Sequence, residues 1–264
     1  MITLGMHCVH GAPLGSEPAR LERIAKLVVD PRWLATFKAI LVGRVPGMPN
    51  EPLPRGRVAA KDLPRVAHEA LVAPTAEWME LKVGATPATD PARFYVNTGR
   101  YDRRPGWANA RRVLPETDTE AATVGWVELQ HAIVDAVGAQ HGVIVVMPTL
   151  ERAQIEIWLQ NMSLDGRSFH PHPDEIASYA VKSPKLGDEY LRAPRWGTYL
   201  SSKHLGAIGG KQRVLDAVQP PVVYEVGALL YFQLSECVAD AMSPTTEAKR
   251  AAFEALVAPL LPPR

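Results

Sequence analysis

The sequence predicts an α+β protein, with short antiparallel strands packed against several helices in a single compact domain spanning residues 1–264. Helical apolar periodicity recurs in separate parts of the chain, and short segments with strand alternation lie between them. No regular strand–helix–strand order, which would build a parallel sheet, runs through the chain. With 47% hydrophobic and 22% charged residues, the composition is that of a globular protein with a buried core.

Residues 1–74 are expected to form a largely helical and proline-rich N-terminal part. The periodicity over Glu17–Leu41 predicts helix, interrupted at Pro31. The Val45–Arg57 segment contains four prolines within nine residues. Because proline fits neither helix interiors nor central strands, we predict an extended loop there.

A hairpin and an arginine-rich loop are predicted next. Glu77–Val83 alternates as strands do, and Arg93–Tyr101 contains the strand-forming residues Phe94, Tyr95 and Val96. The loop between them is rich in proline and threonine. The arginines that continue to Arg112 surround Pro105 and Gly106, which favours a loop over a helix.

A long helix is predicted from Asp118 to about Ala139. Glu128 and Asp135 share one face of this helix with His131. No Lys or Arg occurs in residues 115–151, so this helix is predicted to offer an acidic surface. Its apolar stripe consists of Trp126, Leu129, Ile133 and Val137.

The region after this helix begins with a predicted buried strand, Val143–Met147. The pattern of Thr149–Asn161 fits a helix and a strand equally well. Asp165–Arg195 is rich in proline and is predicted to be loop around a short helix at Asp174–Val181.

The last third has clearer signals. Two short helices are predicted at Ser201–Leu205 and Lys211–Val218, separated by a glycine pair. Two strands are predicted at Val222–Val226 and Ala228–Leu234, with a turn at Gly227. A final helix is predicted after an N-cap serine that precedes a proline, Ser243-Pro244.

The charge and the cysteine content limit the classes of protein to which this chain can belong. The net charge of +1 conceals an excess of seven basic residues in 1–115 and of six acidic residues in 116–264. A near-neutral chain argues against a dedicated nucleic-acid-binding domain, although the Arg93–Arg112 arginines lie among Tyr95, Tyr101 and Trp107. Two cysteines do not make a disulfide framework. With no signal peptide and no apolar run of membrane-spanning length, we expect a cytoplasmic protein.

No complete catalytic or cofactor motif is found. Gly206–Gln212 is not a phosphate-binding loop, since Leu205 replaces its first glycine and Gln212 its hydroxyl residue. Cys8 and Cys237 lack the context of a catalytic thiol. We therefore expect no enzyme activity, no cofactor and no metal. Two clusters contain residue types that bind metals, but neither has a second ligand pair at the spacing of a known metal motif. One cluster consists of His7, Cys8 and His10, and the other of His170, His172, Asp174 and Glu175.

The C-terminal part resembles a known family. A Trp-x-x-Tyr-Leu segment at Trp196–Leu200 leads into the turn Leu205–Gly210, and a strand pair and a closing helix follow. This pattern resembles the TsiV-like immunity proteins of type VI secretion, loosely over residues 75–262 and more specifically over residues 195–262. The resemblance implies that residues 75–262 form a family-like core and that residues 1–74 are the more variable part. We expect the residues of this motif to stabilise the fold and not to take part in chemistry, with the two aromatic residues in the core. The motif consists of Trp196, Gly197, Tyr199, Leu200, Leu205, Gly209 and Gly210.

The resemblance implies an immunity protein that binds and neutralises a cognate secreted toxin by occluding its active site. It further implies a nuclease acting in the cytoplasm as the target, with no direct contact of this chain with nucleic acid or membrane. A nuclease groove is basic, so an acidic surface suits it. We expect that surface to comprise Glu116, Asp118, Glu120, Glu128 and Asp135. The sequence does not decide whether the chain forms a homodimer. The alternative function is that of a hydrolytic or metal-dependent enzyme with its site near His170, His172 and Asp174.

Overall fold

A computed structural model describes residues 2–10, 14, 17–28, 39–43, 51–53, 62, 65–66, 68–69, 78–82, 92–97, 106–114, 120–147, 191 and 194–261. In this part of the chain, ten strands form one sheet in the order β3-β2-β4-β5-β6-β1-β7-β8-β10-β9, and every neighbouring pair is antiparallel. The strands are β1 (Ile2–His10), β2 (Ala39–Gly43), β3 (Glu51–Leu53), β4 (Trp78–Lys82), β5 (Ala92–Asn97), β6 (Gly106–Leu114), β7 (Ala139–Met147), β8 (Gly197–Ser201), β9 (Val222–Val226) and β10 (Leu229–Gln233).

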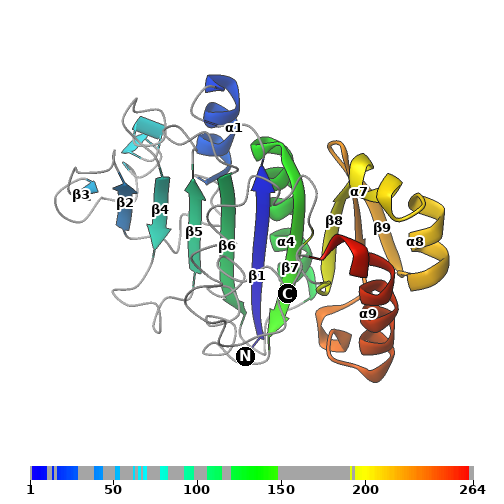
Figure 1. Ribbon diagram of the computed structural model, residues 1–264. Coiled ribbons are helices and arrows are strands. Elements are labelled where there is room, and N and C mark those ends of the chain that lie inside the picture. The colour runs from blue at the N-terminus through cyan, green and yellow to red at the C-terminus, as the bar shows by residue number, and fades with distance from the viewer. Residues whose placement is uncertain are drawn as a thin grey trace, which may run out of the picture.

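Helices cover the sheet, which confirms the predicted α+β class. The helices are α1 (Pro18–Val28), α4 (Glu120–Val137), α7 (Ser202–Ala207), α8 (Lys211–Val218) and α9 (Pro244–Val257), with short 3₁₀ turns at Val238–Asp240 and Ala258–Leu260. Figure 1 shows α7, α8 and α9 beside β8 and β9, at the opposite end of the sheet from β3.

Strands β8 and β10 are buried on both faces, because alternate side chains enter two different cores. Tyr199 and Tyr231 belong to the core beneath α4, which also contains apolar side chains of α1 and β1. Leu200 and Phe232 belong to a second core that α8 and α9 close. In that core the rings of Phe232 and Phe253 meet edge to face, with centroids 5.0 Å apart. This C-terminal part of the sheet therefore lies between two helical layers.

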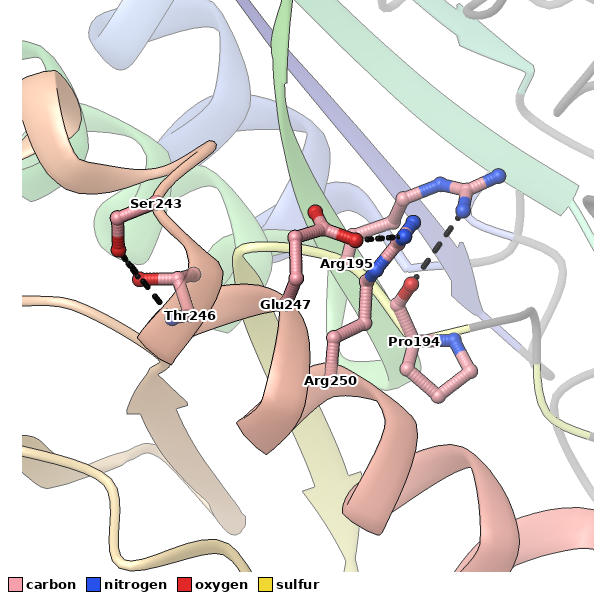
Figure 2. A network of polar contacts seen from close by, with 6 residues as sticks. All are labelled: Pro194, Arg195, Ser243, Thr246, Glu247 and Arg250. Carbon is pink, nitrogen blue, oxygen red and sulfur yellow. Dashed lines mark hydrogen bonds and ion pairs between the residues drawn. The ribbon is translucent and has the colours of Figure 1, made fainter.

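The N-terminus of α9 is capped as the sequence predicts. Ser243 has an extended backbone and its Oγ accepts a hydrogen bond from the Thr246 N–H, while Pro244 occupies the first helical turn. Figure 2 shows this cap beside the ion pair that Arg250 forms with Glu247 one turn later.

Strand β1 lies inside the sheet, which the sequence analysis did not foresee. It pairs with β6 on one side and β7 on the other, so that Met6 lies opposite both Ala110 and Ile144. Leu4, Met6 and Cys8 are fully buried in the core beneath α4. A short apolar segment at the start of the chain therefore forms part of the centre of the fold.

Three predicted elements are wrong. Residues 39–41, the end of the segment predicted as helix, belong to strand β2 (Ala39–Gly43), because a strand on each side pairs with them. Part of the proline-rich loop forms β3, which tolerates Pro52 because it is an edge strand and needs only one hydrogen-bonded side. The described part of the arginine-rich segment predicted as a loop, from Gly106 onward, forms β6, which pairs with β5 and β1.

The remaining predicted elements are confirmed where the structure describes them. The hairpin corresponds to β4 and β5, the long helix to α4 and the buried strand to β7. The two short helices, the last strand pair and the closing helix also occur as predicted. Thr149–Asn161 and the short helix at Asp174–Val181 lie outside the described residues.

Candidate functional site

The predicted acidic surface is smaller than the sequence suggests. Glu116 and Asp118 lie outside the described residues, and Glu120 is described only as the first residue of α4. Glu128 is exposed on α4. Asp135 is half-buried, and its Oδ2 accepts a hydrogen bond from Arg23 of α1 at 2.7 Å. This ion pair offsets the charge of Asp135 within the fold, so Glu128 is the acidic side chain that this surface leaves available.

The turn between β9 and β10 packs directly against Asp135. Gly227 has φ +57°, a left-handed conformation that favours glycine. A Cβ atom at this position would lie 2.4 Å from Asp135 Oδ1. The Asp135 side chain therefore lies against the β9–β10 turn and also pairs with α1.

His131, one turn before Asp135 on α4, lies among three tyrosines of the sheet; we call His131, Tyr199, Tyr224 and Tyr231 the His131 cluster. Its ring centroid is 4.4 Å from that of Tyr231 and 5.6 Å from those of Tyr199 and Tyr224. The Nδ1 atom of His131 and the hydroxyl of Tyr199 are 2.8 Å apart and hydrogen bonded. The cluster joins α4 to β8, β10 and β9.

Burial sets the protonation state of this cluster. It lowers the pKa of His131 to about 4, because the charged imidazolium would lose its hydration. Burial likewise raises the pKa of Tyr199 and Tyr231 well above the usual value, and both phenols stay protonated. At neutral pH the side chains of His131, Tyr199 and Tyr231 are therefore uncharged.

Polar contacts continue from the cluster to the end of β10. The Tyr231 hydroxyl donates to Gln233 Oε1 at 2.9 Å. The Trp196 indole N–H donates to Ser235 Oγ at 2.7 Å, and that hydroxyl donates to the Cys237 carbonyl. These contacts hold the ends of β8 and β10 together.

The residues of the family-like motif lie in the two cores and in one turn. Trp196 and Tyr199 are 5% and 0% exposed. A Cβ at Gly197 would lie 2.8 Å from the Tyr231 hydroxyl oxygen and 3.1 Å from Ile144 Cβ, so glycine at this position leaves room for the Tyr231 side chain. Gly209 and Gly210 have φ values of +92° and +98° and form the turn between α7 and α8. Leu200 and Leu205 contribute to the second core.

The histidine pair on the other face of the sheet also has structural contacts. The Nδ1 atom of His141 is 2.8 Å from the Tyr199 carbonyl oxygen and hydrogen bonded to it. His204 Nδ1 is hydrogen bonded to Ser201 Oγ at 2.8 Å, and Ser201 is the N-cap of α7. The two rings lie 5.8 Å apart. These side chains fix the start of α7 on the sheet.

Candidate metal ligands are not brought together among the residues with described positions. No group of three or more His, Cys, Asp or Glu side chains that could hold a metal ion occurs there. Cys8 is buried in the core beneath α4. The alternative site at His170, His172, Asp174 and Glu175 lies outside the described residues.

One surface combines exposed groups of α4 and β9. Tyr224 of β9 is 48% exposed and stacks on Tyr231 with ring centroids 5.6 Å apart. Val124, 51% exposed, and Glu128 share the α4 stripe that contains His131. The sequence analysis placed His131 and Glu128 on one face but missed the tyrosines, since their approach depends on strand pairing.

The comparisons with known proteins add one finding. No protein-family model and no curated protein matches the sequence. Among solved structures, the fold is similar to that of the Pseudomonas aeruginosa T6SS protein PA0821, with a TM-score of 0.65 over 97% of this chain and 73% of the other. The two sequences are 10% identical, so the likeness shows a shared fold. No described helix is long and apolar enough to cross a membrane.

Proposed function

We propose that this chain is an immunity protein of a type VI secretion system, which binds a cognate toxic effector and occludes its active site. The observation that supports this most is the likeness of nearly the whole chain to the T6SS protein PA0821 of P. aeruginosa. The sequence resemblance of residues 195–262 to immunity proteins points the same way, and it rests on different information.

The surface of α4 and β9 is the region that we propose for toxin binding. Glu128 provides an exposed carboxylate, and Tyr224 provides an exposed aromatic ring held by its neighbours. Aromatic anchors with a charged rim are typical of tight protein interfaces. A nuclease with a basic groove is the target that suits an acidic helix best.

Co-expression tests the proposal. The protein encoded next to this chain's gene should stop growth when produced alone, and growth should return when this chain is produced with it. The two proteins should also co-elute from a sizing column. If this chain neither restores growth nor co-elutes with that protein, the immunity function is wrong.

A charge reversal tests the location of the interface. Glu128→Lys should weaken the complex and change its salt dependence, because a favourable charge pair becomes repulsive. Asp216→Lys is the matched control, since Asp216 is an exposed acid on α8, a helix of the second core on the other face of the sheet. Equal affinities of the two variants would exclude Glu128 from the interface.

A further inference from the structure

We propose that the outer edge of β9 binds an extended segment of the partner, which adds to the sheet as a further strand and carries a basic side chain toward Tyr224 and Glu128. The inference rests on the proposed function, and it specifies how the partner binds.

Among the described strands, β9 is one of the two ends of the sheet and pairs with β10 alone. The strand at the other end, β3, contains a proline, which is a common protection of an edge against further pairing. The five residues of β9, Val-Val-Tyr-Glu-Val, contain neither proline nor lysine. This edge is therefore chemically competent to accept another strand.

The pairing register identifies the free backbone groups. Val226 lies opposite Leu229 across the two-residue turn, and such a flanking pair is hydrogen bonded. Hydrogen-bonded and non-hydrogen-bonded pairs alternate along antiparallel strands. Tyr224 therefore directs its N–H and C=O toward β10, whereas Val223 and Glu225 direct theirs away from the sheet, where a new strand would meet them.

The side chains of β9 offer a different surface on each face. Tyr224 lies on the α4 side against His131, and its stacking on Tyr231 holds the ring in place before any partner arrives. Glu225 lies on the α8 side, 3.3 Å from the Lys211 ammonium group and 78% exposed. An ordered, exposed tyrosine ring is a suitable platform for a cationic side chain.

Charge indicates a basic segment as the occupant. Glu128 is exposed and has no ion pair within the described part of the chain, and residues 115–151 contain no Lys or Arg. Asp135 is already paired with Arg23, and His131 is neutral at pH 7. A second copy of this chain on the same edge would add another acidic helix on the same face, so a basic partner segment fits better.

The experiment compares two substitutions of one residue. Glu225→Pro removes the outward N–H and obstructs a neighbouring strand, while Glu225→Ala removes the carboxylate and its contact with Lys211 but keeps the N–H. The probe is the active-site-inactivated protein encoded next to this chain's gene. We expect Glu225→Pro to weaken its binding about tenfold or more and Glu225→Ala to change it about threefold or less. Tyr224→Ala should also weaken binding, since it removes the proposed platform.

Hydrogen exchange of the wild-type chain gives a readout that does not depend on the folding of a variant. The amides of Val223 and Glu225 should exchange freely in the isolated chain and become protected when the probe is added. A complex in which these amides stay unprotected, or in which folded Glu225→Pro binds as the wild type does, would refute the edge site and leave the immunity function standing. A dimer of the isolated chain that Glu225→Pro dissociates would also refute it, because the occupant would be a second copy. Failure of the wild type to bind the probe would instead count against the proposed function.

Discussion

His131 should make the stability of this fold depend on pH in a specific window. Its pKa is about 4 in the folded chain and about 6.5 in the unfolded chain, so the unfolded chain takes up the proton first on acidification. The contribution of neutral His131 is fully present above pH 6.5 and is lost as the pH falls toward 4. From these two values, lowering the pH from 8 to 5 should cost about 2 kcal/mol of unfolding free energy, and the loss should approach about 3 kcal/mol below pH 4.

Urea denaturation at pH 8, 6 and 5, followed by circular dichroism, measures this loss. Other groups titrate in the same range, so the comparison is with His131→Phe, which keeps a ring of similar size beside Tyr231 but cannot take up a proton. This variant should be less stable at pH 8, because the Tyr199 hydroxyl loses its partner. Its stability should nevertheless fall by about 2 kcal/mol less between pH 8 and 5. Parallel pH profiles of the two proteins would refute the argument that burial keeps His131 neutral.

Three further substitutions test the packing. Gly227→Ala should destabilise the fold by about 2 kcal/mol, since it combines left-handed strain with a clash against Asp135 Oδ1, and about 1 kcal/mol of that should vanish in an Asp135→Ala background. A urea-denaturation cycle measures this coupling, and additive effects would contradict it. Ser243→Ala should cost about 1 kcal/mol because the Thr246 N–H loses its cap, and the neighbouring exposed substitution Thr245→Ala should cost less in the same assay. Phe253→Ala should cost about 3–5 kcal/mol by opening a cavity beside Phe232, and a loss below about 1 kcal/mol in chemical denaturation would mean that the second core is poorly packed.

Sequence patterns predict those elements correctly whose conformation depends on residues close by in the chain. The serine and proline that start α9, the periodicity of α4 and the glycine turn between β9 and β10 each depend on neighbouring residues, and the structure confirms each. The errors concern strands with distant partners. Residues Ala39–Gly43 have apolar spacing that also suits a helix, and only the approach of β3 and β4 determines that they are a strand.

The site was foreseen in part for the same reason. A helical wheel places Glu128, His131 and Asp135 on neighbouring parts of α4. It cannot show that Arg23 pairs with Asp135, because this contact spans 112 positions of the sequence. Nor can it bring Tyr199, Tyr224 and Tyr231 around His131, since that depends on how three strands align.

The central place of β1 affects how the chain folds during synthesis. Its first partner, β6, begins at Gly106 and its second, β7, ends at Met147. At translation rates of about 5–20 residues per second, β1 waits at least about 5 s for β6 to leave the ribosome. Helix α4, which covers the side chains of Leu4, Met6 and Cys8 in the fold, follows β6 in the sequence and is also missing during that interval. The nascent chain is therefore expected to depend on a chaperone, and a slow stretch of translation before β6 would prolong its exposure to aggregation.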